Sequence, residues 1–108
     1  MARIWKFDAE TGNINIEKIK NFKVMLMNSK FNKCSQPGEE QLIATGGHEG
    51  IVTVWRASNC QDVATLSHTQ SDPNFEGLEI DWQNSKSLAV TGKSKNIFLW
   101  DITTPLLP

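Results

Sequence analysis

A stretch that ends in tryptophan occurs twice in this chain, and a shorter copy stands near the N-terminus. The two long copies are ATGGHEGIVTVW, up to Trp55, and VTGKSKNIFLW, up to Trp100, and ARIW ends at Trp5. The three tryptophans recur at intervals of 50 and 45 residues. A period of this length is that of one supersecondary unit, which buries its faces against neighbouring copies. The repetition therefore predicts a small set of similar units rather than a single irregular core.

The segments around these tryptophans have the composition of β-strands. Each is short, rich in β-branched and aromatic residues, and bounded by Gly, Asn, Asp or Ser. Gly46–Gly50 is typical of a tight turn that needs positive φ, so its flanking strands form a hairpin. The predicted strands are Gln41–Thr45, Ile51–Arg56, Asp62–Leu66, Gly77–Trp82, Ser87–Thr91 and Asn96–Trp100.

Residues 22–40 are open to more than one interpretation. Phe22–Met27 can be a strand followed by a long loop, or the strand can lie nearer Cys34, with Pro37-Gly38 as a short turn. A helix over Ile16–Met27 competes with both, because EKIKNFKVMLM contains good helix formers.

Strands that end in tryptophan and follow Thr-Gly and a tight turn resemble those of the WD-repeat family, and Trp100-Asp101 is the dipeptide that names it. The family builds β-propeller blades of four antiparallel strands. The resemblance implies an all-β fold, a partial β-propeller of about two to three blades in an incomplete ring. Met1–Phe7 and Ile14–Ile19 would be the third and outer strands of one blade. The implied division is the end of a preceding blade at 1–20, one full blade at 21–68, a loop insertion at 69–76, three strands of a further blade at 77–102 and a tail at 103–108.

Blades of this family often carry a buried hydrogen-bonded network of His, Ser or Thr, Asp and Trp. Such a network makes physical sense, because an indole N–H and a buried carboxylate need partners once they leave water. The resemblance implies two incomplete copies, since Glu49 and Ser94 stand where Asp would be and no His precedes Phe22. The implied network residues are Thr45, Glu49, Trp55, His68, Thr91, Trp100 and Asp101.

Within this family, ARIW and LEIDWQNSKSLAV look most like the transducin-beta-like 1 nuclear corepressor subunits, chiefly through Leu78, Asp81 and Trp82. This implies a scaffold in a chromatin or transcriptional corepressor complex, in the nucleus or the cytoplasm with the nucleus favoured, and with corepressor, deacetylase or histone-type partners. A substrate receptor of a ubiquitin ligase is an alternative, but the Arg that many such receptors carry two residues after Trp-Asp is Thr103 here. A truncated propeller fragment without independent function is another.

Composition narrows the classes of partner and cofactor. The 11 basic and 12 acidic residues, with a net charge of -1, do not indicate the clustered basic face of a nucleic-acid-binding protein. No apolar run approaches the ~20 residues that span a bilayer, and the N-terminus lacks the apolar region of a secretory signal, so we expect a soluble, intracellular protein. Cys34 and Cys60 are isolated, and we expect free thiols, no metal and no cofactor.

Motifs of common enzymes are missing from the sequence. His48-Glu49 lacks the second His four residues on, where Val52 stands, and the glycines around it lack the Lys-Ser/Thr ending of a P-loop. No serine lies in a G-x-S-x-G elbow. We therefore expect no catalytic residue, with His68 as a loop residue rather than a base.

Protein binding is the function that remains, because loops on a rigid scaffold are where recognition residues concentrate. The resemblance places the loops from outer to inner strands and from second to third strands on one face. Roughly two and a third blades cannot close a ring, so we also expect uncovered apolar faces and a need for further blades from the same or another chain. The candidate partner-binding residues are His48, Glu49, Phe75, Lys93, Ser94 and Lys95.

Overall fold

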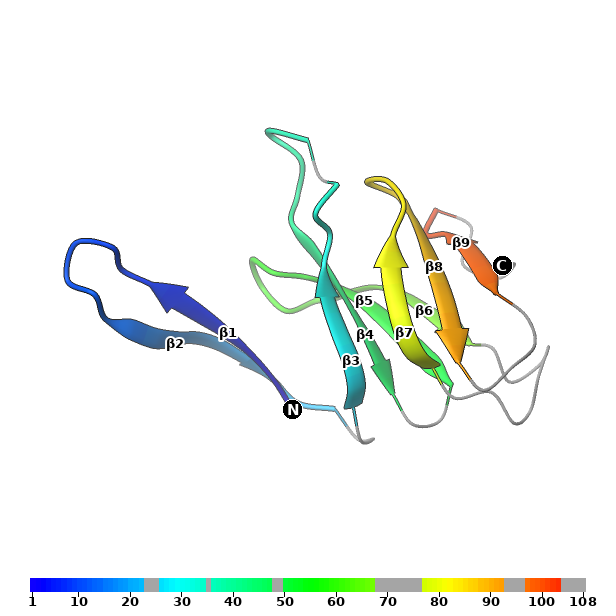
Figure 1. The fold of residues 1–108 in the computed structure, drawn as a ribbon, viewed down its shortest axis with the longest axis horizontal. Helices are drawn as coiled ribbons and strands as arrows, with labels where there is room; N and C mark the ends of the chain where they lie inside the picture. The colour runs from blue at the N-terminus through cyan, green and yellow to red at the C-terminus, as the bar shows by residue number, and fades with distance from the viewer. Residues whose placement is uncertain (23–25, 35, 48–49, 68–76, 93–96, 104–108) are drawn as a thin grey trace.

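Nine β-strands in three antiparallel sheets make up the computed structural model, which describes residues 1–22, 26–34, 36–47, 50–67, 77–92 and 97–103 (Figure 1). The strands follow one another in chain order within each sheet. No helix in this described part is long and apolar enough to cross a membrane. The two-stranded sheet is β1 (Ala2–Phe7) and β2 (Ile14–Lys20); the four-stranded sheet is β3 (Leu26–Phe31), β4 (Leu42–Gly47), β5 (Ile51–Arg56) and β6 (Asp62–Ser67); and the three-stranded sheet is β7 (Gly77–Trp82), β8 (Ser87–Gly92) and β9 (Phe98–Asp101).

The prediction of an all-β chain is confirmed, and none of the three sheets closes into a barrel. β1 and β2 fall within residues 1–20, β3 to β6 within 21–68, and β7 to β9 within 77–102. Residues 68–76 and 104–108 lie outside the described residues, so the structure gives no account of the loop insertion or of most of the tail.

The two larger sheets pack face to face, and the pairing register decides which side chains meet between them. Ala44 lies opposite Val54, and Val54 lies opposite Ala64, so these side chains share the inner face of the four-stranded sheet. The opposing sheet contributes alternate residues of all three of its strands. The core formed in this way contains Leu42, Ala44, Val52, Val54, Ala64, Leu66, Ile80, Trp82, Leu88, Val90, Phe98, Trp100 and Ile102.

Hydrogen bonds between side chains and main chain join the sheets at the β3–β7 side of this core. The indole Nε1–H of Trp82 donates to the carbonyl oxygen of Lys30 at 3.1 Å. The buried amide of Asn32 donates from Nδ2 to the carbonyl oxygen of Ser85 at 3.0 Å. Because buried polar groups need partners, these bonds set how β7 lies along β3 as well as satisfying the donors.

The strand in residues 22–40 differs from both sequence-based alternatives. β3 covers Leu26–Phe31, later than Phe22–Met27 and earlier than Cys34, and the proposed helix over Ile16–Met27 is wrong, because β2 and β3 occupy parts of it. β3 includes Asn28, Ser29 and Lys30, which have no strong strand preference. Pairing with the buried central strand β4 therefore outweighs local propensity here.

The last predicted strand is shifted in the structure. β9 covers Phe98–Asp101 rather than Asn96–Trp100; Ile97 is not part of the strand, and Asn96 lies outside the described residues. Asp101, which the sequence suggested as the first residue after the strand, pairs with Ser87 inside the ladder. Phe98 and Trp100 are buried, whereas Leu99 and Asp101 are exposed. This alternation of core-facing and solvent-facing side chains covers the whole of β9.

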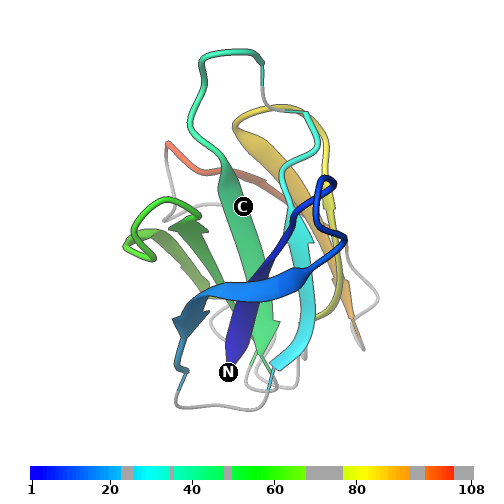
Figure 2. The same ribbon diagram turned by 90° about the vertical axis from the view of Figure 1, so that its left-hand side faces the viewer.

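The β1–β2 hairpin lies outside the two packed sheets (Figures 1 and 2). Lys18 and Lys20 at the end of β2 hold it, since their Nζ atoms donate to the carbonyl oxygens of Ala57 at 3.1 Å and Cys60 at 2.5 Å. Lys20 also forms an ion pair with Asp62 at 2.9 Å. The hairpin is thus attached through one end of one strand to the turn between β5 and β6.

Cys60, in this same turn, has φ of 63°, in the left-handed region that non-glycine residues rarely adopt. We expect Cys60→Gly to raise the free energy of unfolding by roughly 0.5 kcal/mol, because relief of the backbone strain exceeds glycine's extra freedom in the unfolded chain. Urea denaturation followed by circular dichroism would measure it. Cys60→Ser removes the thiol but keeps the strain, so it should be neutral; an equal gain in Cys60→Ser would show that the thiol, not φ, limits stability.

Candidate protein-interaction groove

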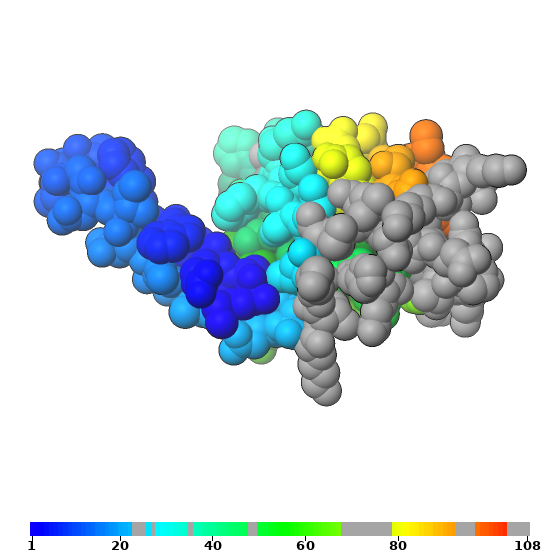
Figure 3. Space-filling model, turned by 60° about the horizontal axis from the view of Figure 1, so that its bottom comes forward, coloured from blue at the N-terminus to red at the C-terminus, as the bar shows by residue number. Residues whose placement is uncertain are grey.

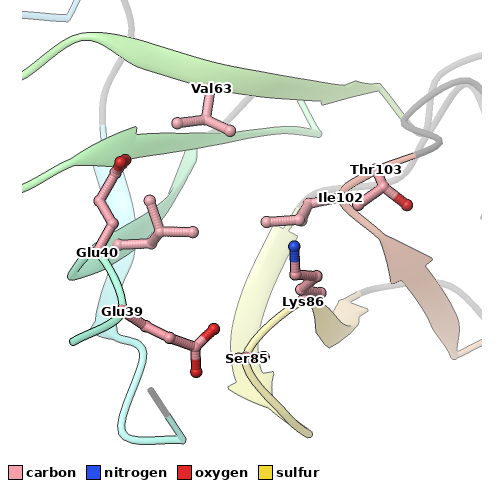
Figure 4. Close-up of a pocket in the computed structure, with 8 residues that line it drawn as sticks. Glu39, Glu40, Val63, Ser85, Lys86, Ile102 and Thr103 are labelled. Carbon is pink, nitrogen blue, oxygen red and sulfur yellow. The ribbon is translucent and has the colours of Figure 1, made fainter. Parts of the chain in front are cut away.

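A groove opens between the two larger sheets at the end where β4 and β8 begin (Figure 4). Its volume is about 430 Å³, within the range of pockets that hold a small ligand or an inserted side chain. Figure 4 shows Val63 and Ile102 pointing into it, and Leu42 completes the apolar part of its wall. The lining residues are Glu39, Glu40, Leu42, Val63, Ser85, Lys86, Ile102 and Thr103.

The charged groups at the rim come from two turns that are far apart in sequence. Glu39 and Glu40 precede β4, whereas Lys86 precedes β8. Glu40 is paired, since Arg56 Nε lies 2.5 Å from its Oε1 and 2.9 Å from its Oε2. Glu39 accepts a bond from the main-chain N–H of Gln36 at 2.7 Å and faces solvent. The groove therefore combines an apolar interior with a rim of both charges, a pattern suited to protein recognition.

Thr103 closes one side of the groove through a local turn. Its hydroxyl donates to Asp101 Oδ1 at 2.6 Å, and its main-chain N–H donates to the same oxygen at 2.9 Å. These two bonds, with a smaller contribution from the charge of Lys86, hold the pKa of Asp101 below its usual value. Asp101 therefore orients the chain after β9, including Thr103 in the wall of the groove.

Trp55 and Thr45 are joined on the opposite face of the four-stranded sheet, away from the groove. The indole Nε1–H of Trp55 donates to Thr45 Oγ1 at 2.8 Å, and both residues are buried. The Thr45 hydroxyl also contacts Ser29 Oγ of β3 at 3.3 Å. Phe22 packs edge-on against Trp55, with ring centroids 6.3 Å apart, and Lys20 Nζ lies 5.6 Å from the Trp55 ring. This cluster links three strands and the end of β2, so its role is structural.

Thr91 is not the counterpart of Thr45 in the three-stranded sheet. Trp55 lies opposite Ile43, and Thr45 stands two residues after Ile43. Trp100 lies opposite Leu88, so the position equivalent to Thr45, two residues after Leu88, is Val90. Side chains alternate along β8, and Leu88 and Val90 are buried on one face. The half-buried side chain of Thr91 therefore lies on the other face. The Thr-Gly alignment misplaces it by one residue, which in a strand reverses the face. Trp100 has an interaction of its own within the fold.

Several predicted site residues lie outside the described residues: His48, Glu49, His68, Phe75, Lys93, Ser94 and Lys95. Conversely, the sequence reasoning missed the groove. It considered the loops that follow β4 and β8, whereas the groove is lined by the turns that precede them. The signal was present, because Glu39 and Lys86 both stand just before a predicted second strand. The sequence does not show that the apolar Val63 and Ile102 line the same groove as these two charged residues.

No three His, Cys, Asp or Glu side chains gather to form a metal site in the part of the chain that the structure describes. Cys34 and Cys60 are both half-buried free thiols, and Cys34 Sγ lies 3.7 Å from the carbonyl oxygen of Trp82. Comparison with family models, with curated proteins and with solved structures finds no match to this chain.

Proposed function

We propose that this chain is part of a WD-repeat β-propeller and serves as a protein-interaction scaffold in a chromatin or transcriptional corepressor complex. The observation that carries the proposal is the stacking of two sheets built alike, each a chain-order meander with a buried Trp near the end of its third strand, at Trp55 and Trp100. Stacked meanders of this kind are the building units of propellers. The sequence resemblance supplies the family, and the corepressor role is inferred from that resemblance alone.

The groove supports a binding role rather than a catalytic one. Its interior offers Leu42, Val63 and Ile102 as apolar surface, whereas Glu39 and Lys86 at the rim can pair with a partner's charges. An apolar side chain of a partner, inserted between the sheets with polar residues on either side, would satisfy this arrangement. The partner we expect is accordingly a protein segment with an apolar anchor and flanking charges.

Val63→Glu should weaken partner binding at least roughly tenfold, because it puts an unpaired carboxylate into the surface that the apolar anchor must cover. Val63 is partly exposed on β6, so the fold should tolerate the change. The measurement is capture of corepressor and deacetylase subunits from nuclear extract by the tagged chain, followed by affinity measurement with the captured subunit.

Thr65→Glu is the matched control. Thr65 is exposed and lies opposite Thr53, on the other face of the sheet from the groove, because a β-bulge leaves Val63 unpaired between Asp62 and Ala64 and breaks the usual alternation. It should leave capture unchanged, and both variants should keep the wild-type circular dichroism spectrum. Capture of ubiquitin-ligase adaptors, or of chaperones alone, would contradict the corepressor assignment. Equal loss in both variants would contradict the assignment of the groove.

A further inference from the structure

The β1–β2 hairpin presents an uncovered apolar face. Trp5 lies opposite Ile16, and Phe7 lies opposite Ile14, so the four side chains share one side of the hairpin. Their exposed fractions are 57% for Trp5, 44% for Ile16, 63% for Phe7 and 61% for Ile14. Exposed apolar patches that reach a few hundred Å² on a soluble protein usually mark an interaction site. We call these four residues the hairpin patch.

Residues of opposite charge flank the hairpin patch at its two ends. Asp8 and Glu10 lie in the turn beyond Phe7, where Asp8 Oδ1 accepts the main-chain N–H groups of Glu10 at 3.0 Å and Thr11 at 3.4 Å. Arg3 lies at the other end, two residues before Trp5, and therefore on the same face of β1. Among the described residues no ion pair involves Arg3 or Glu10. The hairpin patch is thus flanked by acidic residues at the turn and, at the base, by Arg3, which lies opposite the exposed Ile19.

This distribution is self-complementary under a two-fold rotation. If two hairpins pack face to face and antiparallel, each apolar middle covers the other, and each acidic turn lies beside Arg3 of the second copy. An interface of this kind, in which one patch meets itself, is the commonest in homo-oligomers. The buried area would be roughly 1,000 Å² in total, at the lower limit for a specific interface, so the affinity should be modest.

We propose that the hairpin patch is the dimerisation surface of this chain, with the same patch of a second copy as its occupant. The hairpin extends away from the two packed sheets in the space-filling view (Figure 3), so a second copy can reach it. The bonds of Lys18 and Lys20 to the β5–β6 turn hold the hairpin in place from its other end. This inference goes beyond the scaffold function and does not depend on the groove.

Sedimentation equilibrium of the 108-residue chain should show a reversible monomer–dimer equilibrium in the micromolar range. Phe7→Ser should weaken the dimer at least roughly tenfold, because the substitution removes two apolar side chains from each symmetric interface. Leu99→Ser is the matched control, since Leu99 is 61% exposed on β9, far from the hairpin in sequence. It should leave the equilibrium unchanged. A monomer at every concentration, assembly beyond the dimer, or an equal effect of Leu99→Ser would overturn the proposal.

Charge reversal tests the antiparallel arrangement without touching the apolar residues. Arg3→Glu and Glu10→Arg should each weaken the dimer roughly tenfold, because the symmetric interface contains each pair twice. The double variant Arg3→Glu/Glu10→Arg restores opposite charges and should return the dissociation constant to within about threefold of wild type. Unchanged circular dichroism would confirm that the variants fold. Failure of the double variant to recover dimerisation would overturn the antiparallel pairing.

Discussion

Trp82→Ala is expected to lower the free energy of unfolding by roughly 3–5 kcal/mol, the cost of removing a large aromatic side chain from a packed core. Trp82 is 2% exposed and lies between the two larger sheets. Its loss also leaves the carbonyl oxygen of Lys30 without the indole donor. Because single domains are stable by only about 5–15 kcal/mol, we expect this variant to be partly unfolded without denaturant. Urea denaturation followed by circular dichroism measures the change.

Two variants separate the causes of this loss. Trp82→Phe keeps most of the apolar volume but not the N–H, so it should cost about 1–2 kcal/mol. Leu99→Ala truncates an exposed apolar residue of the same sheet, and should change stability by less than about 0.5 kcal/mol. If Trp82→Ala cost less than about 1 kcal/mol, the stacking of the two sheets in solution would be in question.

Thr45→Val is expected to cost about 1–3 kcal/mol, although it hardly changes the size of the side chain. The substitution removes the only oxygen within the described residues that accepts from the indole N–H of Trp55. Trp55 is 1% exposed, so water cannot replace the hydroxyl. A buried donor without an acceptor bears its full desolvation penalty. Thr53→Val, on the neighbouring strand and directly opposite Thr45, is the matched control and should change stability by less than about 0.5 kcal/mol.

A double-mutant cycle with Trp55→Phe shows whether the hydrogen bond is the cause. Once the indole N–H is absent, Thr45→Val has no donor to leave unpaired and should cost roughly 0.5 kcal/mol or less. The coupling energy between the two sites should therefore be about 1–2 kcal/mol. Additive costs in the double variant would mean that Thr45 acts through packing alone.

The strands could be predicted where local pattern and tertiary environment agree. Gln41–Thr45 and Ile51–Arg56 consist mostly of apolar and β-branched residues. The central strand β5 has the predicted bounds, and β4 (Leu42–Gly47) begins one residue later and ends two residues later than predicted. β3 could not be predicted, because its polar residues Asn28, Ser29 and Lys30 become a strand only by pairing with β4. Propensity describes a residue in isolation, whereas a ladder satisfies main-chain groups whatever the side chain is.

The candidate site residues could be predicted less well than the strands, because their arrangement depends more on tertiary structure. Repetition in the sequence pointed to Thr45, Trp55, Thr91 and Trp100, and the first pair is hydrogen-bonded. It could not place Thr91, because a shift of one residue in a strand moves a side chain to the other face. The sequence also could not bring Val63 together with Ile102, since 38 residues separate them and sheet packing alone makes them neighbours.

The sequence by itself determined the all-β class and most of the strands, because alternation and turn residues act over a few neighbouring positions. Only the tertiary structure decided which faces are covered. It buried Trp82 between two sheets, opened the groove beside Ile102 and left the hairpin patch around Trp5 and Phe7 exposed. The physical reason is that burial depends on what lies opposite a strand, and residues far away in the chain supply that surface.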